Sequence, residues 1–200
     1  MSQEVLAGQR HSELVLPMVR QALGEAGLVL AELDGIAFGA GPGSFTGLRI
    51  ACGVAQGLAL GADLPVAGIC TLEALAQEAE GSRIIAALDA RMSQIYHAVY
   101  EEGAAGWRSV TEPVLCFPHD APLVPGDNWT GCGSGFDSYD EVLRARYGDS
   151  IKHTIGGIRP HARSIARLAA PRFAAGEAVD PADATPLYIR NKVALKEAER

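Results

Sequence analysis

A glycine-rich stretch between residues 39 and 47 carries the residue types that most plainly suggest chemistry. It reads G-A-G-P-G-S-F-T-G, follows the apolar run Gly35–Phe38 and precedes a segment of small and apolar residues. The pattern predicts a strand, a tight loop and a helix. Glycines let backbone amides crowd together, and the first helical turn leaves N–H groups at the positive end of the helix dipole. The residues that would contact a phosphate group there are Gly41, Gly43, Ser44, Thr46 and Gly47.

Two phosphate-binding motifs do not fit this stretch. A Walker loop needs Lys after its last glycine, whereas Gly47 is followed by Leu48 and Arg49. The dinucleotide fingerprint fails because Ser44 or Thr46 replaces its third glycine, depending on where the motif is started. Walker chemistry and dinucleotide binding of these types are therefore excluded.

A serine-hydrolase site is also disfavoured. The nucleophile elbow G-x-S-x-G requires glycine two residues before the serine, but Pro42 precedes Ser44 and Cys132 precedes Ser134 at that distance. The structural alternative is that Ser44 or Thr46 caps a buried helix whose small residues allow close packing. Both the phosphate and the capping interpretations remain open from the residues alone.

Two further candidates lie later in the chain. Asp89 ends a predicted strand and Arg91 follows it; the carboxylate could bind a metal or nucleotide, or pair with Arg91 to shape a turn. A second glycine-rich turn, Gly131–Gly135, could hold a phosphate or form a strand-to-helix corner.

Histidine and cysteine spacing predicts no metal site. No two histidines stand four residues apart, and no C-x-x-C occurs. The histidines are His11, His97, His119, His153 and His161. The cysteines, which we expect to be reduced, are Cys52, Cys70, Cys116 and Cys132.

The bulk composition is that of an α/β protein with a negative net charge. The 200 residues are 48% hydrophobic and 20% charged, with 23 glycines and a formal net charge of −7. Tight binding to tRNA by this chain alone is disfavoured on electrostatic grounds. Basic residues nevertheless concentrate late in the chain, where they could contact RNA or form a solvated face. They are Arg159, His161, Arg163, Arg167 and Arg172.

No segment has the pattern of a secretory signal or the long apolar span of a membrane helix. We therefore expect a cytoplasmic protein with no membrane partner.

The elements that would position these residues divide into an alternating half and a strand-rich half. In the first half we expect helices at Gln9–Ala26, after Ser44 and at Leu72–Glu80, and strands at Gly35–Phe38 and Leu64–Ile69. This alternation predicts a parallel sheet.

From Ser82 onward the pattern predicts an antiparallel meander. Its strands are Arg83–Asp89, Gln94–Tyr100 and Arg108–Val114, and later elements are a strand at Trp129–Cys132 and helices from Ser138 or Tyr139 to Arg146 and at Arg163–Ala175. We expect an N-terminal lobe over 1–81, a C-terminal lobe over 82–178 and a tail over 179–200.

One long stretch matches a known family. The residues G-A-G-P-G-S-F-T-G-L-R-I-A-C-G-V-A-Q-G-L-A-L-G, continued by L-P-V-A-G-I-C-T-L-E-A-L-A, closely resemble the bacterial TsaB (YeaZ) family, as do Leu88–Met92 and the tail Thr185–Ala194. The resemblance implies a two-lobe α/β fold of the actin, Hsp70 and sugar-kinase class, which is ribonuclease H-like. Compared with that family, the N-terminal lobe here is expected to lack its first two strands, as in a truncated chain.

The resemblance also implies a function. By this resemblance, the chain is expected to be a non-catalytic platform that forms a heterodimer with the transferase TsaD. With the ATPase TsaE, that pair would make N6-threonylcarbamoyladenosine in tRNA. The resemblance implies that the chain has no catalytic residue, metal or cofactor of its own, although residual nucleotide hydrolysis stays open. It also implies that ATP or ADP could bind at a partner interface and that the chain contacts tRNA only indirectly. The partner-interface residues carried over onto this sequence, which a homodimer could also use, are His11, Leu14, Val15, Met18, Leu48 and Cys52.

Three alternatives stay open. The chain could be a nucleotide-binding kinase or hydrolase that uses the cleft between the lobes, with Asp89 and the loops at Gly41 and Gly133 as phosphate contacts. It could be a self-associating scaffold. The apolar stripe of the first helix could also be ordinary core.

Overall fold

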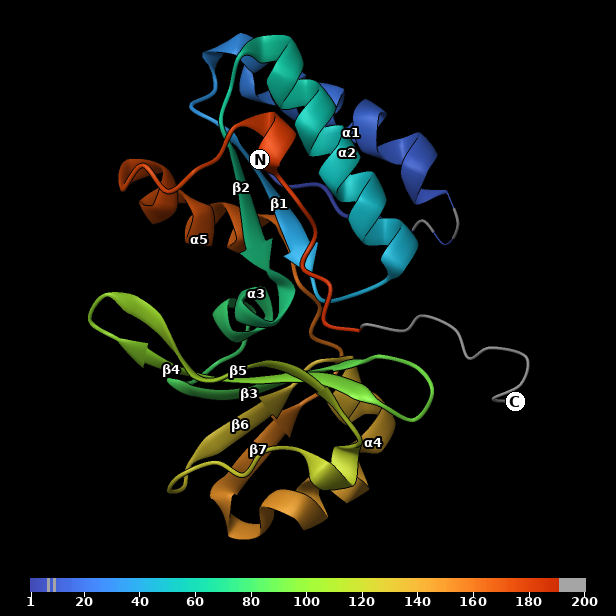
Figure 1. The fold of residues 1–200 in the computed structure, drawn as a ribbon, viewed down its shortest axis with the longest axis vertical. Coiled ribbons are helices and arrows are strands. Elements are labelled where there is room, and N and C mark those ends of the chain that lie inside the picture. The colour runs from blue at the N-terminus through green and yellow to red at the C-terminus, as the bar shows by residue number, and fades with distance from the viewer. Residues whose placement is uncertain (7, 9, 191–200) are drawn as a thin grey trace. The chain divides into compact units, whose positions relative to one another are not determined.

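The computed structural model describes residues 1–6, 8 and 10–190, which fall into two compact units. Unit 1 contains Met1–Ala74 and Pro160–Pro186, and unit 2 contains Leu75–Arg159 and the segment from Leu187. Figure 1 shows the helices and strands along the chain. The elements are α1 (His11–Ala26), β1 (Ile36–Gly41), α2 (Phe45–Ala62), β2 (Val66–Cys70), α3 (Thr71–Glu78), β3 (Arg83–Asp89), β4 (Ile95–Gly103), β5 (Gly106–Cys116), β6 (Trp129–Cys132), α4 (Ser134–Tyr147), β7 (Ile151–Ile155) and α5 (Ala162–Ala174).

These units divide the chain differently from the lobe boundaries that the sequence suggests. The expected second lobe runs to residue 178, but α5 packs on β1 and β2 and so belongs to unit 1. The start of the expected tail also belongs there, because the amide of Val66 donates to the carbonyl of Val179 at 2.9 Å. Residues 191–200 of that tail, including the end of the family-like signature, lie outside the described residues.

The sheet of unit 1, in the part of the chain that the structure describes, is the parallel pair β1 and β2, with Ile36 opposite Val66. Side chains alternate between its two faces, as the pleat of a strand requires. Phe38 and Ala40 face α2, whereas Ala37 packs in the cluster that α5 covers. Figure 1 accordingly shows α2 and α5 on opposite faces of the pair.

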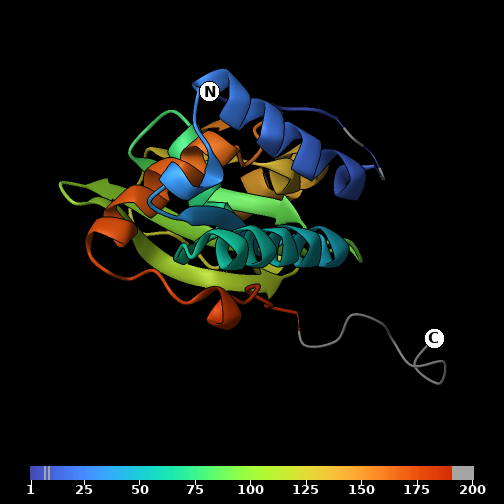
Figure 2. The same ribbon diagram turned by 90° about the horizontal axis from the view of Figure 1, so that it is seen from above.

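Helix α1 begins slightly later than the sequence pattern predicts and ends at Gly27, whose φ of 68° suits glycine. It runs beside α2 (Figures 1 and 2). All of its residues are described, and none of them is buried. The apolar stripe on α1 is therefore only partly covered within its own unit.

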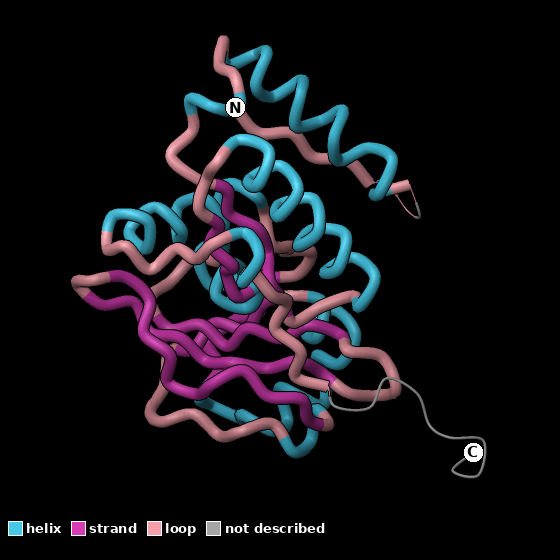
Figure 3. Tube along the Cα trace, turned by 45° about the horizontal axis from the view of Figure 1, so that its top comes forward, coloured by secondary structure: helices cyan, strands magenta, loops and turns pink. Residues whose placement is uncertain are grey.

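Unit 2 is built on a five-stranded sheet in the order β5-β4-β3-β6-β7, seen as a tube in Figure 3. Strands β3, β4 and β5 pair antiparallel, which confirms the predicted meander. Strands β6 and β7 continue the sheet parallel to β3. The core on one face joins Ile85, Ile95 and Val99 of the sheet to Phe136 and Leu143 of α4.

Two features of unit 2 escape the sequence pattern. Helix α4 starts at Ser134, and the residue where we expect the helix to begin, Tyr139, has non-helical dihedral angles within it. Strand β7 is not predicted, because I-K-H-T-I alternates over only five residues and follows the helix through a single turn. The helix begins early because Gly133 and Gly135 let its first turn touch β3.

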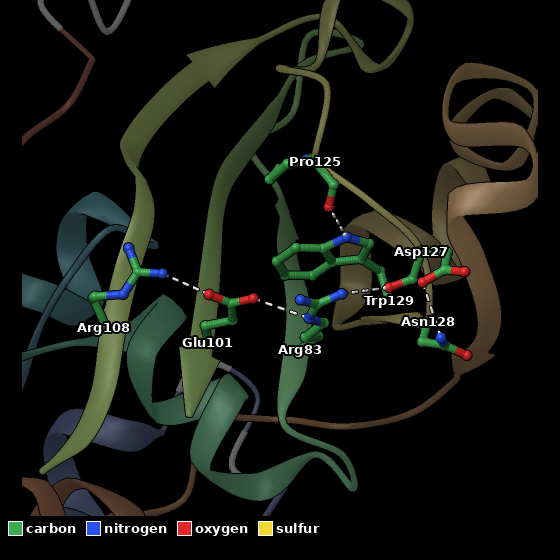
Figure 4. Close-up of polar contacts among 7 residues, drawn as sticks. All are labelled: Arg83, Glu101, Arg108, Pro125, Asp127, Asn128 and Trp129. Carbon is green, nitrogen blue, oxygen red and sulfur yellow. Dashed lines mark hydrogen bonds and ion pairs between the residues drawn. The ribbon is translucent and has the colours of Figure 1, made fainter. Parts of the chain in front are cut away.

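An ion-pair network joins the start of β3 to β4 and, through β4, to β5 (Figure 4). Glu101 of β4 pairs with Arg83 at 2.9 Å and with Arg108 of β5 at 2.5 Å. Arg83 also donates to the carbonyl of Asp127 at 3.0 Å and lies 5.6 Å from the ring centre of Trp129. The fully buried Trp129 in turn donates from Nε1 to Pro125 at 2.9 Å. Arg83 of β3 and Trp129 of β6 thus both bind carbonyls of the loop before β6.

Replacing Gly133 by alanine tests the close approach of α4 to β3. A Cβ at Gly133 would lie 2.4 Å from the Ala87 carbonyl oxygen, and its φ of 94° is strained for alanine. We expect Gly133→Ala to lower the free energy of unfolding by about 2–4 kcal/mol in urea titrations.

The control is Gly103→Ala in the same unit, where a Cβ meets nothing closer than the Gly106 carbonyl oxygen at 3.7 Å. This change should stay within about 0.5 kcal/mol of the unaltered chain. Equal effects of the two substitutions would contradict the close packing that we describe.

Candidate functional site

The loop between β1 and α2 is closed by contacts within unit 1. Gly41 and Pro42 are buried, and the Thr71 hydroxyl donates to the Pro42 carbonyl. A Cβ at Gly39 would lie 3.2 Å from the Thr71 Cγ2 atom, so glycine allows the strand to pass close to α3. Contacts within unit 1 therefore shape this loop.

Ser44 caps α2, as the structural interpretation of this loop predicts. Its hydroxyl accepts from the Gly47 amide at 3.4 Å, and its carbonyl accepts from the Leu48 amide at 2.9 Å. The nearby guanidinium of Arg49 lies 3.9 Å from the Phe45 ring centre. Phosphate binding by Gly41, Gly43, Ser44, Thr46 and Gly47 stays a prediction.

The partner-facing residues expected on α1 are half-buried. They are His11, Leu14, Val15 and Met18. His11 Nδ1 lies 3.1 Å from the Gly8 carbonyl. Beside this stripe the side chain of Leu16 is 50% exposed. Helix α1 thus offers apolar surface that its own unit leaves uncovered.

Two of the expected interface residues lie in the core of unit 1 instead. Leu48 and Cys52 are 7% and 5% exposed, and Cys52 packs in the cluster that joins α2 to β1. The Cys52 thiol donates to the Ala184 carbonyl at 3.4 Å, and Gln56 donates to the same oxygen at 3.1 Å. Their burial corrects the expectation of a surface role: α2 turns these side chains inward, and burial also raises the pKa of the Cys52 thiol.

The outward side of α2 has a different character. Gly53, Gly57 and Gly61 follow one another at every fourth position and are exposed. Among the described residues, no atom lies within 4 Å of a Cβ built at any of the three, apart from the helix's own backbone. Residues four apart share one helix face, so α2 presents a smooth strip of bare backbone.

Asp89 shapes the turn between β3 and β4. Its carboxylate accepts from the Arg91 amide at 2.8 Å and lies 3.5 Å from the Arg91 guanidinium. Arg91, Met92 and Ser93 all have φ between 54° and 62°, an uncommon conformation for residues with side chains. Arg190 donates to the Ala90 carbonyl at 2.9 Å from the outside of this turn. These contacts support the structural interpretation of Asp89.

The second glycine-rich turn forms a tight strand-to-helix corner. A Cβ at Gly135 would lie 2.7 Å from the Ala87 Cβ, and the Ser134 hydroxyl accepts from the Asp89 amide at 3.0 Å. The sequence alone did not reveal this bond. The repeated pattern of glycine, serine and phenylalanine at both strand-to-helix junctions is the one signal that could have suggested it.

The basic residues near the end of the chain do not act as one group. Arg172 is engaged within unit 1, where it pairs with Glu73 at 3.0 Å. Burial raises the pKa of Glu73, and the Arg172 charge opposes that rise. His161 lies 3.5 Å from Glu4, whereas Arg163 and Arg167 are exposed on α5.

Over residues 1–6, 8 and 10–190, no three His, Cys, Asp or Glu side chains come together as a metal ion would require. Within the same residues, α2 alone is long and apolar enough to cross a membrane by length and composition, and its inner side packs on β1.

Substitution of Asp89 separates its turn-forming role from a ligand-binding one. Asp89→Ala removes the acceptor of the Arg91 amide and should lower the free energy of unfolding by about 1–2 kcal/mol. Asp89→Asn retains an acceptor oxygen and should cost less than about 0.5 kcal/mol. Urea titration followed by tryptophan fluorescence measures both, and an asparagine variant as unstable as the alanine variant would count against this role.

Comparison with known proteins agrees with these features. Residues 5–124 match the family model described as "TsaD: tRNA N6-adenosine threonylcarbamoyltransferase". The "tRNA threonylcarbamoyladenosine biosynthesis protein TsaB" of Escherichia coli (strain K12) is 35% identical over 204 residues, which cover 96% of this chain and 85% of that protein. The protein of the same name from Haemophilus influenzae is 35% identical over 205 residues, covering 96% and 84%.

Solved structures give the same result. "YeaZ from Pseudomonas aeruginosa" superposes with a TM-score of 0.82 at 38% identity, covering 89% of this chain and 84% of that one. A structure titled "Crystal structure of an uncharacterized protein with similarity to peptidase YEAZ from Pseudomonas aeruginosa" has a TM-score of 0.83 at 38% identity, with coverages of 90% and 84%. The predicted two-lobe α/β fold is thereby confirmed, and the chain belongs to the TsaB (YeaZ) family.

Proposed function

We propose that this chain is a non-catalytic partner subunit in the formation of N6-threonylcarbamoyladenosine in tRNA. In this role it forms a heterodimer with the transferase TsaD and acts with the ATPase TsaE in the cytoplasm. The proposal is supported by the names of relatives that match 96% of the chain. ATP or ADP, where one takes part, is held at an interface with these partners and not by this chain alone.

The observation that carries the proposal is the unusual outer surface of α1 and α2. A glycine inside a helix costs about 0.5–1 kcal/mol relative to alanine. The three exposed glycines on one face of α2 allow no close contact that would offset this cost, since a Cβ at any of them would touch none of the described residues. Close approach of another helix explains them, because bare backbone permits short interaxial distances.

The adjoining helix supplies apolar area for the same surface. No residue of α1, which is described in full, is buried, although it carries Leu14, Val15, Leu16 and Met18. Apolar side chains clustered at the centre of an interface contribute most of its binding energy. A partner that covers both helices would bury this stripe.

The identity of the family model supports TsaD as that partner. The model describes a threonylcarbamoyltransferase, yet it matches residues 5–124 of this chain, a range that includes α1 and α2. A transferase of that family therefore has segments related to both helices. Two related helix pairs can pack against each other about an approximate twofold axis, as identical ones do in a homodimer. The same surface thus serves the heterodimer and, in its absence, a homodimer.

The charge of the chain supports an indirect role toward tRNA. With a formal net charge of −7, the chain lacks the excess of Lys and Arg that neutralises phosphates. Asp89, the residue that a kinase or hydrolase would need, is engaged by the turn that follows it. The chemistry therefore belongs to the partner in this proposal.

An added side chain on the outer face of α2 tests the interface. Gly57→Arg points into open space in the isolated chain, so its fold should persist by circular dichroism. We expect its affinity for TsaD to fall at least about 30-fold, equivalent to about 2 kcal/mol, by titration calorimetry. The double variant Leu14→Glu with Met18→Glu should have the same effect through the stripe of α1.

The matched control is Ala145→Arg, an exposed position on α4 in unit 2. This variant should bind TsaD as the unaltered chain does. Unchanged affinity of Gly57→Arg would remove α2 from the interface, and no binding of TsaD by the unaltered chain would overturn the proposal.

Calorimetry and phosphate release with ATP and Mg²⁺ test the enzyme alternative. We expect the isolated chain to show no turnover above a protein-free blank, because the candidate phosphate loops are occupied by their own structural contacts. Turnover that disappears in Asp89→Ala and persists in Ala145→Arg would instead establish a kinase or hydrolase.

A further inference from the structure

The core of unit 2 contains a buried histidine that the proposed function does not use. His97 lies on β4 between Ala87 of β3 and Val114 of β5, and it is 0% exposed. Its Nε2 atom is 2.7 Å from the hydroxyl oxygen of Tyr147 at the end of α4. The other ring nitrogen, Nδ1, is buried and has no hydrogen-bond partner among the described residues.

The geometry selects one tautomer of this imidazole. The Tyr147 hydroxyl has a single proton, and its oxygen lies within reach of both His97 Nε2 and the Pro122 carbonyl, the latter at 3.2 Å. The carbonyl can only accept. If His97 carries its proton on Nε2, that N–H donates to the hydroxyl oxygen and the hydroxyl donates to Pro122, so both bonds form. With the proton on Nδ1, one of these bonds is lost and a buried N–H is left unpaired.

This relay joins three segments of unit 2. His97 belongs to the sheet, Tyr147 to the last turn of α4, and Pro122 to the loop between β5 and β6. The neighbouring Arg146 binds the same loop, since its Nε donates to the Ala121 carbonyl at 2.9 Å. Two successive side chains of α4 therefore hold two successive carbonyls of the loop, and the histidine anchors the arrangement to the sheet.

We propose that His97, held as the Nε2–H tautomer by this relay, makes the packing of α4 and the β5–β6 loop on the sheet dependent on pH. Protonation adds a proton at Nδ1, where the core provides no acceptor. The charged imidazolium is then buried without a counter-ion, and unit 2 opens to hydrate it.

The surrounding groups do not offset that charge. Ala87 and Val114 face His97 from the adjoining strands, and Tyr147 and Cys116 are neutral below pH 7, because burial raises the pKa of Tyr147 and raises that of Cys116 to about 11. Of the charged neighbours of Cys116, Asp120 raises its pKa and Arg146 lowers it. Burial lowers the pKa of His97 to about 4, from an ordinary value of 6.5.

The sign of the effect follows from proton uptake. Between pH 6.5 and about 4 the unfolded chain binds a proton at this histidine and the folded chain does not. Stability is therefore highest above this window and falls as the pH is lowered through it. The unfolding equilibrium constant should rise about tenfold for each pH unit, the slope expected for one proton.

Urea titrations of the full chain between pH 7 and pH 4 measure this slope. Both tryptophans, Trp107 and Trp129, lie in unit 2, so tryptophan fluorescence reports on that unit. We expect His97→Gln to remove the one-proton slope and to leave the shallower change that carboxylates cause. The matched control His153→Gln replaces an exposed histidine of the same unit and should retain the full slope.

Nitrogen-15 spectra of the histidine side chains test the same proposal without relying on a core substitution. In the unaltered chain His97 should appear as a single Nε2–H tautomer that does not titrate above pH 5. Tyr147→Phe removes the acceptor of Nε2–H and should abolish the preference for this tautomer. An Nδ1–H tautomer, titration of His97 near pH 6.5, or equal pH slopes in the unaltered chain and His97→Gln would overturn the proposal.

Discussion

The structure depends on how closely a helix can begin against a strand that lies beside it. At the start of α4, Gly133 and Gly135 bring the first helical turn to within van der Waals distance of Ala87 on the neighbouring strand, and a Cβ at either glycine would clash there. The start of α3 follows the same plan, because Gly39 of β1 passes close to Thr71, the first residue of that helix. Ser44 caps α2 in the loop that follows β1. Glycine is used at both places because a Cβ there would meet atoms of the neighbouring segment. The same residue type would serve a phosphate loop, which is why the pattern alone cannot separate the two roles.

The two faces of helix α2 differ in what they contact. Its inner face, with Cys52 and Ala55, completes the core over β1, whereas its outer face carries three glycines at which a Cβ would touch none of the described residues. A subunit that lends surface to another chain needs this division, since the inner face must hold the helix in place while the outer face stays open. The negative net charge of the chain fits such a role better than independent binding to tRNA.

Unit 2 contains polar contacts of two kinds, one partly exposed to solvent and one buried in the core. Glu101 near the end of β4 is shared by Arg83 and Arg108, and all three remain partly hydrated, so their attraction is screened and modest. His97 and Tyr147 are buried in the core, where each hydrogen bond has a larger effect because no water replaces it. The same unit therefore has ion pairs where solvent tolerates charge and a neutral relay where it does not.

The sequence by itself determined the family, because the resemblance lies in one long continuous motif. It also determined the alternation of elements in the first half and the meander in the second, because both follow from the periodicity of apolar residues. It also offered a cap at Ser44 or Thr46 and a turn at Asp89, each as one of two interpretations, and the structure places the cap at Ser44. Tertiary structure alone decided that α5 returns to unit 1, that Leu48 and Cys52 point inward, and that His97 meets Tyr147. Each of these depends on contacts between residues far apart in the chain, and a pattern read along one strand or helix records only which faces are apolar, not which distant segment covers them.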